Sequence, residues 1–358
     1  MDSLLRHWPT LPEATGGPGP RGLRVAVLSG GPSWERAPSL ASGAAVCDGL
    51  TDAGHTPIPI EIGLDGAWRS GDETIVVEPG GGLEDVDVAF PALHGPFGED
   101  GKIQGLLECL GVPYVGSGVM ASAICLDKVV FKRLMSQAGL PQVDHRAVRV
   151  DEWRADPAAV LERLPTMGLP LFVKPAGLGS SFGVTLVEDA HELARAIDFA
   201  FEYDSLAVVE AAAGGIEVEC SIIGNANPYV TEPGELVVVA SKSGWRDRET
   251  KFTRGSIRLV APARLPQAVR ERIRAIAAEA FSLTGCAGIA RVDFFVDGEQ
   301  VLLNEVNTMP GLKQTSVFSL MLNREGLDYP RMLDRLVQLA LERASDQAMA
   351  APTRVPGG

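Results

Sequence analysis

The sequence predicts an α/β fold whose N-terminal part contains a parallel sheet. Residues 23–31, LRVAVLSGG, form a short apolar run that ends in glycines, and a helix-like segment follows from Ala37 to Ala53. A second apolar run begins at Val86, and a third short strand is expected at 112–115. Strands that alternate with helices are typical of parallel sheets, which bind ligands at the carboxyl ends of their strands. Four polar residues fall at these ends: Glu35, His94, Glu99 and Asp100.

The composition is that of a globular chain and limits its partners. The 358 residues are enough for two or three domains, and no apolar run approaches the roughly 18 residues of a membrane span. A net charge of −14 disfavours nucleic acid as a general partner. The five cysteines are scattered and never spaced as CxxC, which argues against a disulfide framework and a zinc site. Residues 1–22 lack a continuous apolar segment, so we expect a disordered leader rather than a signal peptide, and a cytoplasmic protein.

The most unusual stretch is residues 285–316, which combine two apolar strands with several polar side chains. Strand alternation places Arg291 and Asp293 together on one face of the first strand, and Glu305 and Asn307 together on one face of the second. Two carboxylates and a carboxamide are hard oxygen ligands of the kind that Mg²⁺ binds beside water or phosphate. These residues predict a metal and phosphate site. The alternative is an ordinary ion pair on the first strand and a capped turn after the second.

The hairpin between these strands constrains the predicted metal site. If it is regular, Asp293 and Glu305 share a face only when the connecting loop has an odd number of residues. A two-residue turn at Asp297-Gly298 would place them on opposite faces. Alternation also predicts that Glu305 shares a face with Val301 and Leu303.

A second candidate site lies at residues 171–184, where an apolar strand carries Lys174 and runs into a loop of three glycines and two serines, Ser180 and Ser181. Glycines let backbone N–H groups approach an anion, the serines add donors, and the lysine adds charge. The segment does not match the P-loop pattern, so we expect a hairpin loop that closes over phosphates. Lys128 lies in a helical pattern at 118–139 and, taken alone, is typical of a solvated surface lysine.

The remaining segments continue the alternation of strands and helices. We expect helices at 190–201, 269–284 and 329–344, and strands at 206–210 and 218–223. Gly285 is placed to cap the helix before it. Residues 241–256 are polar and aperiodic with five basic side chains, which predicts a lid.

Taken in order, several motifs make the chain resemble the D-alanine–D-alanine ligases of the ATP-grasp superfamily, from about residue 25 to residue 341. The motifs are GGPSWERAPSLASG (30–43), HGPFGEDGKIQG (94–105), GSGVMASAICLDK (116–128), VKPAGLGSSFGV (173–184), ETKFTRGS (249–256) and ARVDFFVDGEQVLLNEVNTMPG (290–311). The resemblance implies an ATP-grasp fold of three α/β domains with ATP bound between the second and third. The expected divisions are a leader at 1–22, domains at 23–124, 125–217 and 218–345, and a disordered tail at 346–358.

The resemblance also implies a reaction, in which ATP phosphorylates the carboxylate of one D-alanine and the amine of a second displaces phosphate. It implies that Lys128, Lys174 and Lys251 contact the ATP phosphates beside Ser180 and Ser181, that Glu210 and Glu217 contact adenine and ribose, and that Asp293, Glu305 and Asn307 hold two Mg²⁺ ions, with Mn²⁺ as a substitute. Arg291 and the Gly311 amide would stabilise the tetrahedral intermediate. Ser180 would also act with the catalytic residues. On the amino-acid side, Glu35 would hold the first ammonium, His94 and Phe252 would also bind substrate, and Ser316 and Val317 would hold the second carboxylate. A homodimer that makes peptidoglycan precursors is expected.

The departures from the family pattern lie on the amino-acid side. Phe252 stands where the family has a lid tyrosine, Ala37-Pro38 replaces an acidic and aliphatic pair, and Leu312-Lys313-Gln314 replaces an aromatic or methionine with small polar residues. The usual proline after Ser316 is missing. The second substrate therefore stays open between D-alanine and the D-lactate, D-serine or other acceptors of resistance and natural-product ligases. A catalytically silent nucleotide-binding protein is a further alternative, against which the intact set of Lys174, Arg291, Asp293, Glu305 and Asn307 argues.

Overall fold

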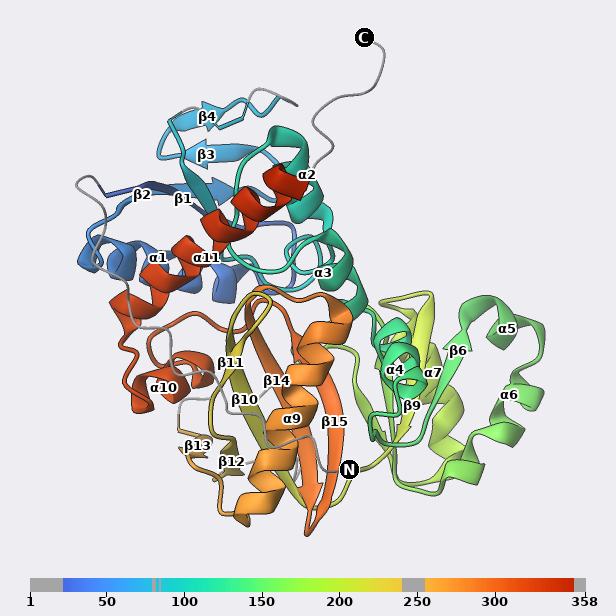
Figure 1. Cartoon of the computed structure of the whole chain (residues 1–358). Coiled ribbons are helices and arrows are strands. Elements are labelled where there is room, and N and C mark those ends of the chain that lie inside the picture. Colours follow the sequence, from blue (N-terminus) through green and yellow to red (C-terminus); the bar gives the residue numbers. More distant parts are fainter. Residues whose placement is uncertain (1–21, 79–81, 84, 240–254, 351–358) are drawn as a thin grey trace.

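The computed structural model describes residues 22–78, 82–83, 85–239 and 255–350, which form three sheets flanked by helices (Figure 1). Residues 1–21 of the predicted leader, Lys251, Phe252 and most of the predicted lid lie outside these residues. Within the described ranges, none of the helices combines the length and the apolar character that crossing a membrane would need.

The N-terminal sheet has the strand order β4-β3-β2-β1-β5. Its centre is parallel, as predicted, because β1 pairs in parallel with both β2 and β5. The antiparallel edge strands β3 and β4 were not predicted, and the strand expected at 112–115 makes only a single bridge, from Tyr114 to Ala89. The elements are β1 (Arg24–Gly30), α1 (Arg36–Asp52), β2 (Thr56–Ile62), β3 (Trp68–Ser70), β4 (Glu73–Ile75), β5 (Val88–Pro91) and α2 (Lys102–Leu110).

The helical pattern at 118–139 forms two helices, α3 (Val119–Leu126) and α4 (Lys128–Gln137). Asp127 separates them, because its backbone is extended and its side chain accepts hydrogen bonds from the amides of Val129 and Val130. A side-chain acceptor at this position caps a helix N-terminus. Lys128 is therefore the first residue of α4 and not a surface residue in the middle of a long helix.

The second sheet is antiparallel, with the order β6-β9-β7-β8. The glycine-rich loop joins β7 to β8, which confirms the predicted hairpin loop. Within it, Ser180 and Ser181 adopt φ angles of +50° and +59°, a left-handed conformation that non-glycine residues rarely adopt. The elements are β6 (His145–Arg149), α5 (Val150–Ala155), α6 (Pro157–Arg163), η1 (Pro165–Met167), β7 (Leu171–Pro175), β8 (Thr185–Val187), η2 (Ala190–Glu192), α7 (Leu193–Phe201) and β9 (Leu206–Ala211).

The third sheet has the order β13-β12-β10-β14-β15, and β11 pairs with β10. Helix α9 packs on one face of this sheet through Ile273, Ala277 and Phe281, and Gly285 ends the helix with a φ of +72°, as predicted (Figure 1). The elements are β10 (Ile216–Gly224), β11 (Tyr229–Val230), β12 (Gly234–Val238), β13 (Ile257–Val260), α9 (Gln267–Thr284), β14 (Gly288–Asp297), β15 (Gln300–Asn307) and α10 (Val317–Arg324).

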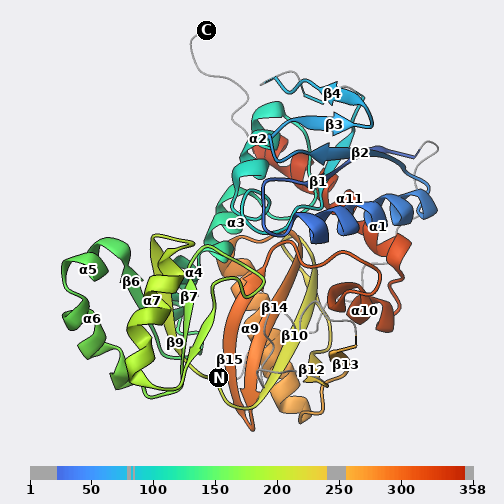
Figure 2. The same cartoon turned by 180° about the vertical axis from the view of Figure 1, so that it is seen from behind.

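The last helix, α11 (Tyr329–Ala350), returns to the N-terminal sheet. Its residues Leu333 and Leu336 share one core with Val25, Leu50 and Phe90, and Figure 2 shows α11 lying beside α1 against that sheet. The helix also extends five residues into the predicted disordered tail, because residues 346–350 are helical. The two ends of the described chain are thus joined by a single apolar core.

A β-bulge makes the β14–β15 hairpin irregular, so the loop-length rule for a regular hairpin does not apply to it. Asp297 pairs with Gln300, so the turn has two residues, an even number, yet Asp293 still lies directly opposite Glu305. The register shifts after Asp293, which leaves Asn304 as the extra residue of a bulge. Val301 and Leu303 are buried in the core against α9, whereas Asn304 and Glu305 line a pocket on the other face. The prediction that Glu305 shares a face with Val301 and Leu303 is therefore wrong.

Candidate active site

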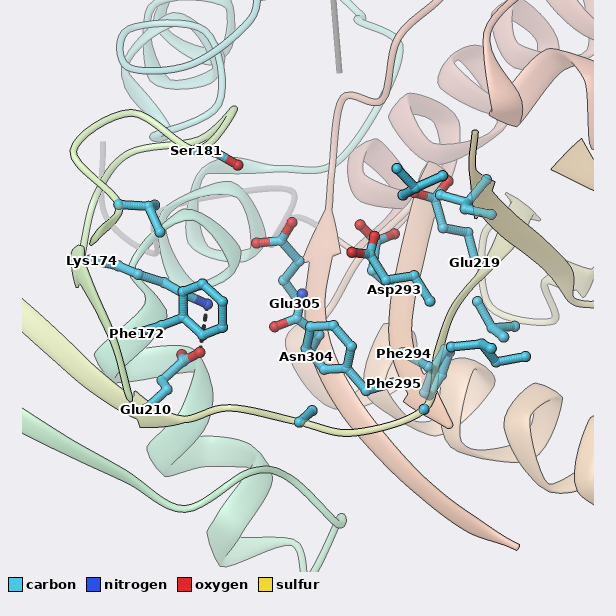
Figure 3. A pocket seen from close by; sticks show the side chains of 18 of the residues that line it. Phe172, Lys174, Ser181, Glu210, Glu219, Asp293, Phe294, Phe295, Asn304 and Glu305 are labelled. Atoms are coloured by element: carbon cyan, nitrogen blue, oxygen red, sulfur yellow. Dashed lines mark hydrogen bonds and ion pairs between the residues drawn. The ribbon is translucent and has the colours of Figure 1, made fainter. Parts of the chain in front are cut away.

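A pocket of about 440 Å³ lies between the second and third sheets. Figure 3 shows Lys174, Phe172 and Glu210 on one side of it and Asp293, Glu305 and Glu219 across from them. The second sheet contributes β7, β9 and the glycine-rich loop, and the third contributes β10, β12, β14 and β15. Site residues predicted from the sequence that line the pocket are Lys128, Lys174, Ser180, Ser181, Glu210, Glu217, Asp293 and Glu305.

A buried carboxylate organises the basic side of the pocket. Lys174 Nζ donates to Glu210 Oε2 at 2.6 Å, and Lys132 Nζ lies 3.1 Å from Glu210 Oε1. Burial alone would raise the pKa of Glu210, but Lys132 and Lys174 outweigh burial and lower it to about 2. Lys174 Nζ also lies 5.6 Å from the centre of the Phe172 ring, a cation–π distance.

The structure adds contacts that the sequence did not predict on this side. Glu210, predicted to contact adenine and ribose, lines the pocket, and its carboxylate is engaged by two lysines. Lys132 was missed, and the signal that could have revealed it is its position four residues after Lys128, on the same side of α4. Lys128 Nζ donates to the backbone oxygen of Leu178, and burial lowers the pKa of Lys128. That lysine therefore holds the glycine-rich loop at the edge of the pocket.

Carboxylates line the opposite side of the pocket, and Arg291 and Asn307 contact one of them, Asp293, without lining the pocket themselves. Arg291 makes a bidentate ion pair with Asp293, with Nε–Oδ1 and Nη2–Oδ2 distances of 2.7 and 2.6 Å, and its Nε lies 3.1 Å from Glu219 Oε2. Asn307 Nδ2 contacts Asp293 Oδ2 at 3.3 Å. Glu219 was missed by the sequence analysis. Glu219 lies on β10, directly opposite Asp293 on β14. It shares a strand face with Glu217, which alternation along the strand could have shown.

The charges on this side favour a bound cation. Burial holds the pKa of Asp293 above its usual range, and Arg291 offsets this only in part because Glu219 and Glu305 raise the pKa further. Three carboxylates, Asp293, Glu219 and Glu305, thus lie near Arg291, with Lys128 as a further cation near Glu305, and a divalent cation would neutralise the remaining negative charge. Within the described residues, no group of three or more His, Cys, Asp and Glu side chains has metal-binding geometry. The predicted metal ligands Asp293, Glu305 and Asn307 include only two carboxylates, because Asn307 would supply an amide oxygen as the third ligand. Oxygen ligands of these types are the ones that Mg²⁺ binds.

The predicted amino-acid residues lie at the end of the N-terminal sheet, beside the glycine-rich loop. The Ser180 hydroxyl donates to the Glu35 carboxylate, which joins this loop to the start of α1. The Trp34 and Phe182 rings add to this contact, with centroids 6.0 Å apart. His94 precedes Gly95, which lies against the Glu35 carboxylate, and has Nε2 2.8 Å from Ser42 Oγ and Nδ1 3.6 Å from Glu99 Oε1.

The residues predicted for the second substrate form a separate group. Gly311 and Ser316 are neighbours, since a Cβ at Gly311 would lie 3.0 Å from Ser316 Oγ. Ser316 immediately precedes α10 and makes no side-chain capping bond to that helix, and Val317 is its first residue. None of these three, nor Glu35 or His94, is among the described residues that line the pocket between the sheets.

Comparison with known proteins gives the same family from sequence and from structure. Two family models match, the D-ala D-ala ligase C-terminus over residues 134–338 and the D-ala D-ala ligase N-terminus over residues 73–117. A D-alanine–D-alanine ligase of Deinococcus radiodurans is 43% identical over 337 residues, which cover 89% of this chain and 98% of the relative. The structure of the D-alanine-D-alanine ligase from Coxiella burnetii has a TM-score of 0.82 and 32% identity, and covers 92% of this chain and 97% of that one. The structure of the VanG D-Ala:D-Ser ligase from Enterococcus faecalis has a TM-score of 0.79 and 32% identity, and covers 89% of this chain and 100% of that one.

Two sheets that face each other across a pocket, with lysines on one side and acidic residues on the other, define an ATP-grasp ligase. The chain belongs to the D-alanine–D-alanine ligase family, as two family models and a relative at 43% identity show. The resemblance, the fold class and the assignment to the ATP-dependent ligases are thereby confirmed. The individual ligand contacts of the site residues remain predictions.

Proposed function

We propose that this chain joins D-alanine to a second D-alanine through a D-alanyl phosphate, at the expense of ATP, and so supplies a precursor of peptidoglycan. The observation that carries this proposal is the pocket itself, where Lys174 and the glycine-rich loop face Asp293 and Glu305. Family membership over nearly the whole chain supports the same reaction. It also argues against a catalytically silent nucleotide-binding protein.

The pocket residues would hold ATP, and the acidic side would hold Mg²⁺. We assign the phosphates to Lys128, Lys174, Lys251 and the serines of the glycine-rich loop, and the metal to Asp293, Glu305 and Asn307. Bound Mg²⁺, as two ions or replaced by Mn²⁺, would neutralise phosphate charge as the acyl phosphate forms. Arg291 is already fixed by two carboxylates, so it would stabilise developing negative charge without moving far.

The amino acids would bind where the N-terminal sheet meets the glycine-rich loop. We assign the first ammonium to Glu35, whose contact with Ser180 would link substrate binding to the position of the loop. His94 supports this region, and Ser316 with the Val317 amide would hold the second carboxylate next to Gly311. The γ-phosphate would pass to a carboxylate oxygen of the first D-alanine. The second amine would then attack the carbonyl carbon and expel phosphate together with that oxygen.

A product assay tests the proposed function. Purified protein with ATP and Mg²⁺ is incubated with D-alanine, D-serine, D-lactate and L-alanine, alone and in pairs with D-alanine, and phosphate and products are measured. We expect D-alanyl-D-alanine and one phosphate per dipeptide. D-Serine is a specific second candidate acceptor, because a D-Ala:D-Ser ligase is 32% identical over 89% of this chain. Absence of phosphate release with every pair would overturn the proposal.

The second prediction concerns Phe252, which lies outside the described residues. A D-amino acid attacks only as its free amine, whereas a hydroxy acid has no ammonium to deprotonate, so lower pH favours the hydroxy acid. The family resemblance associates an aromatic residue without a hydroxyl at this position with D-lactate use. We expect measurable D-alanyl-D-lactate, in a ratio to D-alanyl-D-alanine that increases as pH falls from 9 to 6, and a lower ratio in Phe252→Tyr. If the wild type and Phe252→Tyr both form only D-alanyl-D-alanine, Phe252 has no role in the choice of the second substrate.

We further propose that the enzyme is a homodimer, that it acts in the cytoplasm on small-molecule substrates, and that its chain divides into the three domains predicted from the sequence. The three sheets follow one another along the chain, in keeping with that division. However, β10 begins two residues before the predicted boundary at 217/218, and α11, which falls in the predicted third domain, shares its core with the N-terminal sheet. Sedimentation equilibrium of the purified protein measures its oligomeric state.

A further inference from the structure

Lys132 is a buried cation that the proposed reaction does not yet use. It lies on α4 with 1% of its side chain exposed, and it does not line the pocket. Its Nζ lies 3.1 Å from Glu210 Oε1, yet among the described residues it has no hydrogen-bond partner of good geometry. The side chain thus directs its charge at one carboxylate.

Stability alone is a poor explanation for this arrangement. Removing a charge from water costs several kcal/mol, and apolar replacements of buried ion pairs are often as stable as the pair or more so. Methionine is an apolar residue of similar length that would suit the surrounding core of α4, where Val129, Phe131 and Met135 are buried. A lysine at this position therefore points to an effect on its carboxylate partner.

The two carboxylate oxygens of Glu210 contact two different lysines, and these lysines differ in solvent exposure. Oε1 faces Lys132, whereas Oε2 accepts from Lys174, which is 15% exposed and lines the pocket. His145 lies opposite Glu210 on β6, and burial lowers its pKa, so it adds no charge near pH 7.5. The two lysines and the glutamate in direct contact carry one net positive charge, and Lys128 is a further cation nearby. Without Lys132, the Lys174–Glu210 pair would be neutral.

We infer that Lys132 is a positioning residue for the nucleotide: it holds and neutralises Glu210, so that the charge of Lys174 remains available to an anionic ligand in the pocket. This inference rests on the proposed ATP-dependent function and extends it to a residue behind the pocket. Lys132 acts through Glu210 and Lys174 and does not touch the nucleotide. Its effect is larger on the nucleotide side, because Glu210 and Lys174 line the pocket whereas Glu35 and Ser316 do not.

Calorimetric titration with the Mg²⁺ complex of a β,γ-imido ATP analogue tests this assignment, with steady-state kinetics alongside. We expect Lys132→Met to weaken analogue binding by about tenfold and to raise the KM for ATP to a similar extent. The KM for D-alanine should change less than twofold, and Lys132→Arg should restore much of the loss. The control is Arg133→Met, which removes an exposed cation from the same helix and should bind like the wild type.

The double variant Lys132→Met/Glu210→Gln separates charge balance from damage to the fold. In the double variant, positions 132 and 210 are uncharged, so the group again carries the one net positive charge of Lys174. The double variant should therefore bind the analogue more tightly than Lys132→Met does. Wild-type-like binding by Lys132→Met would overturn the inference. The inference would also be overturned if Lys132→Met weakened the binding of nucleotide and of D-alanine equally and lowered Tm, because that result indicates a structural role only. Failure of the wild type itself to bind the analogue would instead contradict the proposed function.

Discussion

Glu305→Gln is expected to reduce turnover at saturating ATP, Mg²⁺ and D-alanine by about a thousandfold, with little change in Tm. The substitution keeps the size of the side chain and removes one negative charge from the acidic side of the pocket. Loss of that charge relieves repulsion toward Asp293, which lies directly opposite, so the fold should not suffer. Turnover is measured by coupled ADP release, and Mg²⁺ dependence by titration of the metal.

Glu299→Gln is the matched control, because Glu299 lies exposed in the two-residue turn of the same hairpin. It should show wild-type turnover and metal dependence. If Glu305→Gln also turned over at a near-normal rate, Glu305 would not be a metal ligand. The ion pair of Arg291 with Asp293 would then be a purely structural contact.

Arg291→Met is expected to lower both stability and turnover. Arg291 is the cation shared by the buried carboxylates Asp293 and Glu219, and removing one partner of a buried ion pair typically costs about 3–5 kcal/mol. The free energy of unfolding, measured with urea, should decrease by an amount in that range. Added Mg²⁺ should recover part of the loss, because a bound cation would neutralise the same carboxylates.

Arg149→Met provides the comparison for this variant. Arg149 pairs with Asp151 on an exposed part of the second sheet, where solvent screens the interaction, so its loss should leave unfolding unchanged within error. Equal stability losses in Arg149→Met and Arg291→Met would show that burial does not strengthen the Arg291 pair. The charge balance proposed for the acidic side would then be wrong.

Residue patterns predicted most elements and the donor types of the site, and they failed where the chain departs from regular geometry. Alternation correctly placed Arg291 and Asp293 on one face of β14. It misplaced Glu305, because the bulge at Asn304 changes the face on which later residues of β15 lie. A bulge leaves no reliable mark in the sequence, since its extra residue need not be a glycine.

Residues that act through tertiary contacts were harder to find. Glu219 and Lys132 occupy ordinary positions of a strand and a helix, and their meaning depends on Asp293 and Glu210, which lie 74 and 78 residues further along the chain. The packing of α11 on the N-terminal sheet depends on contacts of still longer range. Local propensity can predict such elements but not the partners that bury them.

Isotope transfer from labelled substrate tests the central claim most directly. D-Alanine with both carboxylate oxygens replaced by ¹⁸O is incubated with the enzyme, ATP and Mg²⁺, and the phosphate is analysed by mass spectrometry. An acyl phosphate intermediate predicts one ¹⁸O atom in each phosphate and one phosphate per D-alanyl-D-alanine, because the expelled phosphate retains the carboxylate oxygen that attacked it. Dipeptide formed with unlabelled phosphate, or with label in AMP instead, would contradict the proposed mechanism.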